Sequence, residues 1–175
     1  MKKENLLPNE FFITKGVGYD SLEKHGGCYH LALYDAGIES YNIMTYSSVL
    51  PANAKLVTLD EIDLPPHGAE MKCIQSVAYG EYGQHISAGI VYAWLYEDEN
   101  FDKKHGGLVV EINGFYSIEV LEERLTLAIN SLYERTYNDK GLYLGELNIT
   151  TQGTDVPNDV RFGCCLVSLC FINYL

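Results

Sequence analysis

Two adjacent serines, Ser47 and Ser48, could support unusual chemistry. They follow an apolar, strand-like run at residues 41–45, and Pro51 ends this pattern three residues after them. When the peptide bond before a serine is held strained, the serine hydroxyl can attack the preceding carbonyl carbon and form an ester. Loss of the acyl group by β-elimination leaves dehydroalanine, which hydrolyses to a pyruvoyl group and ammonia. The chain is then cut, and the new N-terminus carries a ketone.

Such a ketone can do the work of a pyridoxal aldehyde in amino-acid chemistry. It forms a Schiff base with an amino acid and accepts the electrons of the breaking Cα–carboxylate bond. A Ser-Ser pair taken alone is far more often part of a turn. The pair therefore indicates chemistry only where the rest of the chain supports it.

Glu111 is a single carboxylate inside an apolar run at residues 108–112. It should be partly desolvated, which makes its protonated form accessible near neutral pH and suits a proton donor to a carbanion. By strand alternation Glu111 shares a face with Val109 and Asn113. The alternative is therefore a carboxylate that faces water on a half-exposed strand.

Asn42 lies six residues before Ser48. By parity the two side chains share a strand face if the strand runs unbroken to Ser48. An amide at this place could orient the scissile peptide bond or hold a substrate carboxylate. The alternative is a structural amide that serves a turn.

Metal and hydrolase chemistry find little support in the sequence. The five histidines form no i,i+4 pair and the five cysteines form no CxxC pair, so we expect no metal site. A serine hydrolase has no GxSxG elbow to build on. The odd number of cysteines and their apolar settings indicate reduced, buried thiols in a cytoplasmic protein.

Length and charge limit the number of domains and the kinds of partner that the chain could have. A chain of 175 residues favours one domain with a continuous core. With 12 Lys and Arg against 24 Asp and Glu, the formal net charge is −12, which disfavours nucleic acid as a partner because phosphate binding needs clustered cations. No run approaches the ~18 apolar residues of a membrane helix, so we expect no membrane partner.

Apolar periodicity predicts the elements that position these residues. Because strands come in adjacent pairs, the sheet should be largely antiparallel or mixed with helices outside it, which is the α+β class. The two glycines at 16 and 18 indicate a tight turn. The predicted strands are residues 11–14, 41–47, 69–82, 85–96, 107–114, 142–149 and 162–174, and the predicted helices are a segment that ends at Gly37 and residues 117–140.

Four stretches in this order resemble the pyruvoyl-dependent arginine decarboxylase family. No single stretch is specific, but the ordered set is, and it spans residues 36 to 164. The stretches are Ala36-Gly37-Ile38 with Asn42 and Ser47-Ser48-Val49-Leu50-Pro51; Ala78-Tyr79-Gly80 followed by Ile86-Ser87-Ala88; Gly107-Leu108-Val109-Val110-Glu111; and Phe162-Gly163-Cys164.

This resemblance implies a four-layer αββα sandwich and a homotrimer of self-cleaved protomers with active sites at subunit interfaces. It implies that Ser48 is the precursor of a pyruvoyl cofactor and Ser47 the new C-terminus, so that one 1–175 domain is cut into pieces of 47 and 128 residues. Glu111 becomes the proton donor, and Asn42 serves processing and substrate placement. The implied reaction converts arginine to agmatine and carbon dioxide, with neither a metal nor pyridoxal phosphate.

One position departs from the family pattern. Family members have an aspartate in the helix that meets the substrate guanidinium, and here His30 occupies that position. A neutral imidazole cannot pair with a guanidinium. Asp35 lies about 140° further round a helix and does not simply replace it. Asp20 or Glu39 could do so.

The candidate substrate-binding residues are therefore His30, Gly37 and Asn42, and the small-molecule substrate is an amino acid. Two alternatives remain open. The same chemistry could act on a different amino acid, or the chain could be an unprocessed relative that serves as a binding or structural subunit.

Overall fold

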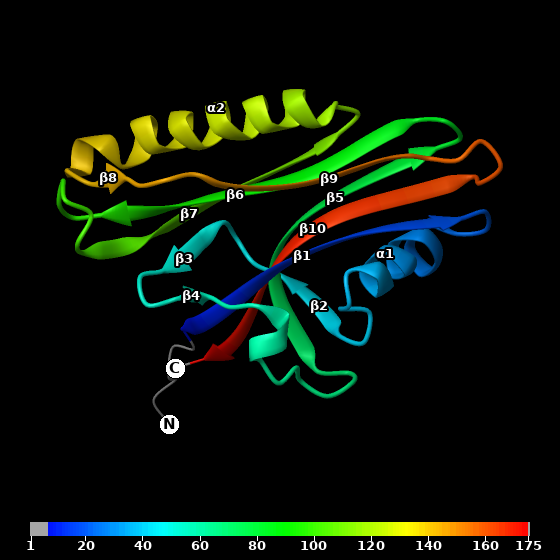
Figure 1. The fold of residues 1–175 in the computed structure, drawn as a ribbon, viewed down its shortest axis with the longest axis horizontal. Coiled ribbons are helices and arrows are strands. Elements are labelled where there is room, and N and C mark those ends of the chain that lie inside the picture. Colours follow the sequence, from blue (N-terminus) through cyan, green and yellow to red (C-terminus); the bar gives the residue numbers. More distant parts are fainter. Residues whose placement is uncertain (1–6, 175) are drawn as a thin grey trace.

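The computed structural model describes residues 7–174, and Figure 1 shows their arrangement. The α-helices are α1 (His30–Asp35), which follows a π-helical segment η1 (Lys24–Tyr29), and α2 (Ile118–Thr136). Two 3-10 segments are η2 (Leu59–Glu61) and η3 (Asn138–Lys140). The strands are β1 (Pro8–Asp20), β2 (Asn42–Thr45), β3 (Val49–Pro51), β4 (Lys55–Leu56), β5 (Glu70–Glu81), β6 (His85–Tyr96), β7 (Lys104–Gly114), β8 (Tyr143–Leu144), β9 (Asn148–Asp155) and β10 (Phe162–Tyr174).

These strands form two five-stranded sheets. The first has the order β2-β5-β10-β1-β4 and is mixed, since β2 and β4 run parallel to their neighbours. The second has the order β3-β7-β6-β8, with β9 also paired to β6, and all of its pairs are antiparallel. The predicted α+β class with mixed and antiparallel pairing is confirmed.

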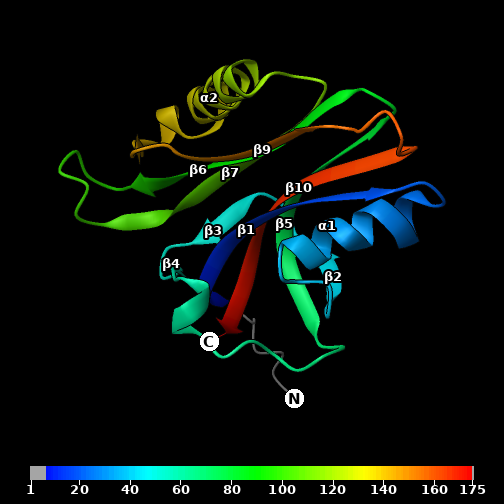
Figure 2. The same ribbon diagram turned by 45° about the vertical axis from the view of Figure 1, so that its right-hand side comes forward.

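The two sheets pack against each other, and each helix lies on one of them (Figures 1 and 2). Between the sheets lies a cluster that includes Phe11, Ile90 and Val109. Under α2, the residues Leu121, Leu125 and Ile129 are fully buried against β6 and β7, and each such side chain contributes about 1.5–3 kcal/mol. A third cluster packs α1 on β1, β5 and β10 through Ala32, Leu33, Phe12, Met71, Cys164 and Leu166.

Strand β1 continues through Gly16 and Gly18, so the turn predicted at these glycines is wrong. A Cβ at Gly16 would lie 2.2 Å from the carbonyl oxygen of Ala32, and one at Gly18 would lie 2.2 Å from that of Cys28. The glycines therefore allow η1 and α1 to lie directly on the strand. Pairing of β1 with β10 overrides the local turn signal.

Several other boundaries differ from the prediction. Strand β2 ends at Thr45 rather than at residue 47, and the predicted strand over 142–149 is two strands, β8 and β9. Strand β9 extends to Asp155, beyond the predicted strand end at residue 149, because it pairs with β6 from Tyr92 back to His85. Helix α2 ends at Thr136, four residues before the predicted end at Lys140. The 3-10 segment η3 follows it, and Gly141 at φ 71° ends that segment.

Candidate active site

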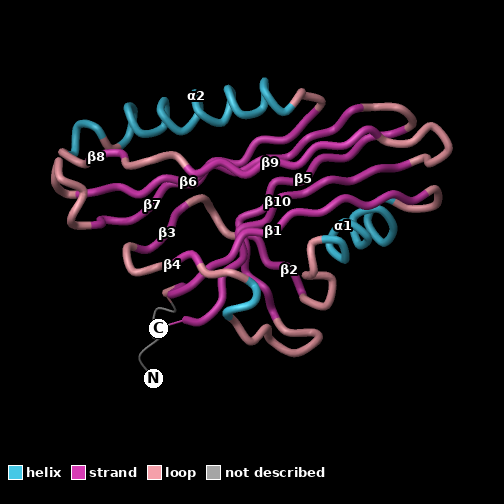
Figure 3. Tube along the Cα trace, viewed as in Figure 1, coloured by secondary structure: helices cyan, strands magenta, loops and turns pink. Residues whose placement is uncertain are grey.

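The segment Tyr46–Ser48 crosses from the first sheet to the second (Figure 3). At its start, the backbone N–H of Tyr46 donates to the carbonyl of Cys73 on β5 at 2.8 Å. At its end, the N–H of Val109 on β7 donates to the carbonyl of Ser48 at 3.0 Å. The peptide bond between Ser47 and Ser48 is therefore held from both sides by different sheets. We call Tyr46–Val49 the junction.

The hydroxyl of Ser48 faces the carboxylate of Glu111. Its Oγ lies 2.9 Å from Oε1 and 2.8 Å from Oε2. Strand β3 pairs with β7 so that Val49 is opposite Leu108, which places Glu111 diagonally across from Ser48 on one face. A carboxylate at hydrogen-bond distance from a hydroxyl can accept its proton.

Glu111 points into the space between the sheets. It shares a strand face with Val109, which is fully buried in the core between the sheets, while its neighbours Val110 and Ile112 pack toward α2. Glu111 itself is half-buried, and Asn113 near the strand end is exposed. Glu111 therefore lies half-buried on the strand face toward the core, and its role as a proton donor stays a prediction.

Asn42 and Ser48 do not lie on one unbroken strand, because β2 ends at Thr45. The condition for a shared face is therefore not met. The Nδ2 of Asn42 donates to the carbonyl of Gly68 at 2.7 Å, and its backbone N–H donates to that of Ala69 at 2.9 Å. Asn42 thus holds the turn that leads into β5, and its role in processing and substrate placement stays a prediction.

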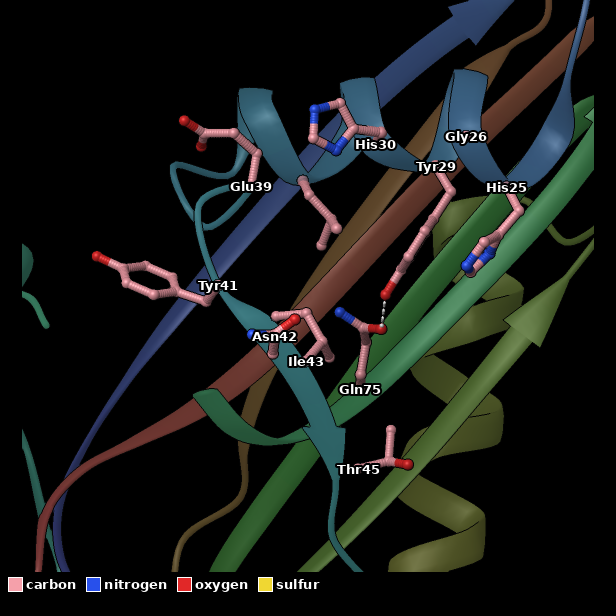
Figure 4. Close-up of a pocket in the computed structure, with 11 residues that line it drawn as sticks. His25, Gly26, Tyr29, His30, Glu39, Tyr41, Asn42, Ile43, Thr45 and Gln75 are labelled. Carbon is pink, nitrogen blue, oxygen red and sulfur yellow. Dashed lines mark hydrogen bonds between the residues drawn. The ribbon is translucent and has the colours of Figure 1, made fainter. Parts of the chain in front are cut away.

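A pocket of about 590 Å³ lies between η1, α1 and β2 (Figure 4). Thr45 at its edge is three residues before Ser48, a stretch of chain that spans at most about 11 Å. The pocket therefore lies close to the junction along the chain. It is lined by His25, Gly26, Tyr29, His30, Leu33, Glu39, Tyr41, Asn42, Ile43, Thr45 and Gln75.

One wall of the pocket is fixed by hydrogen bonds. The hydroxyl of Tyr29 donates to Oε1 of Gln75 at 2.9 Å, and Nε2 of Gln75 donates to the hydroxyl of Ser168 at 2.7 Å. Burial raises the pKa of Tyr29 to about 12, so this hydroxyl remains a donor. The ring of His25 stacks on that of Tyr29 with centroids 5.2 Å apart.

His30 and Glu39 lie on the other side of the pocket. His30 and Glu39 come from the start of α1 and from the segment after it (Figure 4). Glu39 is the one carboxylate among the lining residues that the structure describes. Asp20 and Asp35 lie elsewhere and accept backbone hydrogen bonds at 2.6 and 2.9 Å. Of Asp20, Asp35 and Glu39, only Glu39 lines the pocket.

The structure thus gathers the predicted residues at two places. Ser48 and Glu111 meet at the junction, and His30 and Asn42 line the pocket. Gly37 has a φ of 72° and ends α1, outside the lining, so its role in substrate binding stays a prediction. The sequence analysis missed the pocket roles of Tyr29 and Gln75, which lie 46 residues apart and share no local motif.

All five cysteines are buried and unpaired, as predicted. Burial raises the pKa of Cys165 to about 12, which keeps this thiol protonated and unreactive. Among the side chains that the structure describes, no group of three or more from His, Cys, Asp and Glu is placed to hold a metal ion. Within residues 7–174, no helix is both long enough and apolar enough to cross a membrane.

The sequence matches the family model of pyruvoyl-dependent arginine decarboxylase over residues 10–175. Pyruvoyl-dependent arginine decarboxylase 1 of Methanosarcina acetivorans is 36% identical over 88 residues, which cover 49% of this chain and 52% of the relative. Pyruvoyl-dependent arginine decarboxylase 2 of the same organism is 42% identical over 71 residues, or 39% of this chain and 37% of the relative.

A relative from Thermoplasma volcanium, named pyruvoyl-dependent arginine decarboxylase, is 29% identical over 157 residues, which cover 84% of each chain. The chain therefore spans about half or less of the Methanosarcina relatives and most of the Thermoplasma one. Since the family model covers nearly the whole sequence, this protein belongs to the pyruvoyl-dependent arginine decarboxylase family.

Proposed function

We propose that this chain is a self-processing decarboxylase that derives a pyruvoyl group from Ser48 and converts arginine to agmatine and carbon dioxide. The observation that carries the proposal is the contact of Ser48 Oγ with both carboxylate oxygens of Glu111, at 2.9 and 2.8 Å. Membership of the family supports the kind of cofactor and the substrate.

The residues at the junction fit the formation of this group. A serine hydroxyl is a weak nucleophile unless a neighbouring base takes its proton, and Glu111 is at hydrogen-bond distance to do so. Strand pairing holds the Ser48 carbonyl, and the attack requires Oγ to turn from Glu111 toward the carbonyl carbon of Ser47. We propose that cleavage falls between Ser47 and Ser48 within a single 1–175 domain.

After cleavage, the pyruvoyl ketone supplies an electrophile that can take up the substrate amine and the electron pair released with carbon dioxide. Glu111 then lies beside the reacting position. Because it is half-buried between the sheets, its protonated form can deliver a proton to the substrate carbon with little competition from water.

We propose that the pocket beside Thr45 receives the substrate side chain. A guanidinium is best bound by a carboxylate, which it can contact with two parallel hydrogen bonds. Glu39 is placed for this role, and the net charge of −12 favours the entry of cationic molecules. Asn42 and His30 line the same pocket and would contact the aliphatic stem or the substrate carboxylate.

His30 is the observation that favours a second candidate, the same chemistry on a different amino acid. An imidazole is a poor neighbour for a guanidinium, and His25 adds a second one to the same pocket. Release of carbon dioxide from labelled substrates distinguishes the two. Release from arginine supports the first candidate, and release only from another amino acid supports the second.

We also propose the four-layer αββα arrangement and a homotrimer of cleaved protomers with interface active sites. The positions of α1 and α2 on opposite sheets support the layers (Figure 2). Apolar side chains near the junction and α1 are exposed and available to a neighbouring copy, among them Val49 at 55% and Tyr34 at 68%. Analytical ultracentrifugation tests the assembly, and a monomer at micromolar concentration would contradict it.

Intact mass spectrometry tests the processing step directly. We expect two polypeptides of 47 and 128 residues, the longer one lacking a free amino terminus and reacting with a carbonyl reagent. A single species of 19.7 kDa that does not react would indicate the unprocessed, non-catalytic relative.

A further inference from the structure

We propose that the backbone N–H of Val49 stabilises the negative charge that develops on the Ser47 carbonyl oxygen during self-cleavage. This N–H donates to that oxygen at 3.0 Å. The inference rests on the proposed function, because it assigns a group to the processing reaction. It adds an oxyanion donor that comes from the backbone of the cleavage site itself.

The hydrogen bond closes a three-residue turn centred on Ser48. Within the described part of the chain, the only non-glycine residues with positive φ are Phe101 and Asn173, so Ser48 has a negative φ. A bond from residue i+2 to residue i at negative φ defines an inverse γ-turn, which is a low-energy conformation common at strand ends. The turn therefore exists without backbone strain at Ser48.

Strand pairing leaves the Val49 N–H available for this role. The N–H of Val109 donates to Ser48, so Ser48 and Val109 form a hydrogen-bonded pair of the β3–β7 ladder. Hydrogen-bonded and non-hydrogen-bonded pairs alternate in an antiparallel ladder, so Val49, opposite Leu108, is at a non-hydrogen-bonded position. Its N–H points away from β7 and toward the Ser47 carbonyl.

Three contacts thus surround the Ser47–Ser48 peptide bond, each on a different atom of these two residues. Val109 fixes the carbonyl of Ser48, Glu111 holds the attacking hydroxyl, and Val49 polarises the carbonyl that is attacked. Strand β7 positions the nucleophile, while the γ-turn positions the electrophile.

The reaction balances without any oxidant or reductant. The Ser48 Oγ–H proton passes to Glu111 as Oγ bonds to the Ser47 carbonyl carbon, and the carbonyl oxygen becomes an oxyanion held by Val49. The C–N bond then breaks, and the Ser48 nitrogen takes the proton, which leaves an ester and a free amine. Loss of the Ser48 Cα hydrogen expels the Ser47 carboxylate, and water converts the resulting dehydroalanine to the pyruvoyl group and ammonia.

A hydrogen bond strengthens as its acceptor gains charge, so this donor contributes more to the transition state than to the resting chain. Loss of one oxyanion donor in enzymes slows reactions by about 10²–10³. Because a γ-turn bond is bent, we expect a smaller factor, of about tenfold or more.

The test replaces the N–H by an ester oxygen. α-Hydroxyvaline is incorporated at position 49 of the full chain during cell-free synthesis, and the appearance of the 47-residue and 128-residue products is followed by intact mass. The matched control carries α-hydroxyleucine at position 50, whose N–H belongs to the β3–β7 ladder through the pair of Leu50 with Gly107. Both changes remove one N–H from the same strand.

We expect cleavage to slow about tenfold or more in the position-49 ester and distinctly less in the position-50 ester. Cleavage of the position-49 ester at the rate of the unsubstituted chain would overturn the role of Val49, and so would equal slowing of both esters. If the unsubstituted chain itself stays whole, the proposed function fails and this inference fails with it. The two failures are therefore distinguishable in a single experiment.

Discussion

The junction and the pocket beneath α1 are built from different kinds of contact. At the junction, backbone groups of β5, β3 and β7 hold Tyr46, Ser47 and Ser48 in turn, and the carboxylate of Glu111 accepts from the Ser48 hydroxyl. In the pocket, side chains from η1, α1 and β2 make the surface, and several of them are exposed. Chemistry is thus tied to strand pairing, whereas recognition depends on side chains that can change without altering the fold.

Replacement of the nucleophile tests the junction most severely. Ser48→Ala should abolish cleavage, because no hydroxyl remains to attack the Ser47 carbonyl. Ser47→Ala keeps that carbonyl and should still be cut. Denaturing gels and intact mass measure both variants, and a Ser48→Ala chain still cut between residues 47 and 48 would contradict the assignment.

Glu111→Gln should slow turnover of the cleaved enzyme by about 100-fold or more, the contribution typical of a positioned general acid. The KM for arginine should change much less, since Glu111 lies at the junction and not in the pocket lining. Kinetics are scaled to the cleaved fraction, because the same variant should also process slowly. A large rise in KM with unchanged kcat would remove the proton-donor role and place Glu111 in recognition.

Glu39→Gln tests whether the pocket binds the substrate guanidinium through Glu39. We expect the KM for arginine to rise roughly tenfold, because a charged hydrogen-bond pair becomes a neutral one, while kcat changes little. Glu123→Gln on α2 is the matched control, since it removes the same charge from the other sheet's helix. Equal effects of the two variants would indicate the overall field and not a specific contact.

The smallest effect is expected at the fixed wall of the pocket. Burial, followed by the neighbouring Cys73 and Cys164, raises the pKa of Tyr29 to about 12, from an ordinary value of 10.0. The folded state thus favours the neutral phenol, and this contribution to stability is complete below pH 10 and is lost as the pH rises through about 12. Tyr29→Phe should flatten the loss of unfolding free energy over that interval.

At pH 8 the same variant should lower the free energy of unfolding by about 1 kcal/mol, since Gln75 loses its partner. Tyr34→Phe is the control, because Tyr34 is 68% exposed. Denaturant unfolding at several pH values measures both variants. An unchanged alkaline profile in Tyr29→Phe would show that another buried group controls it.

The features that follow from local rules were predictable from the sequence. Alternation placed Val109 and Glu111 on one face and Val110 on the other, and φ 72° at Gly37 ends α1 as its glycine indicated. The class of fold followed from the succession of paired strands. The ordered set of stretches brought Ser48 and Glu111 into one hypothesis, although 63 residues separate them.

Features that depend on long-range packing were not predictable. Gly16 and Gly18 give the same local signal whether the chain turns or a helix approaches, and only the position of α1 decides between them. Strand β2 ends after Thr45 because the chain passes from the first sheet to the second. No residue type in this segment indicates that crossing. The contact of Tyr29 with Gln75 joins two segments whose relative position is a property of the whole fold.

The order β2-β5-β10-β1-β4 has a consequence for the proposed cleavage after residue 47. The shorter fragment would contain β1 and β2, which both pair with strands of the longer fragment. Strand β1 pairs with β10 over twelve residue pairs. The two fragments would therefore share one sheet. We expect them to copurify until a denaturant unfolds that sheet. Cleavage would free the two new ends at Ser47 and Ser48, which lie beside Glu111.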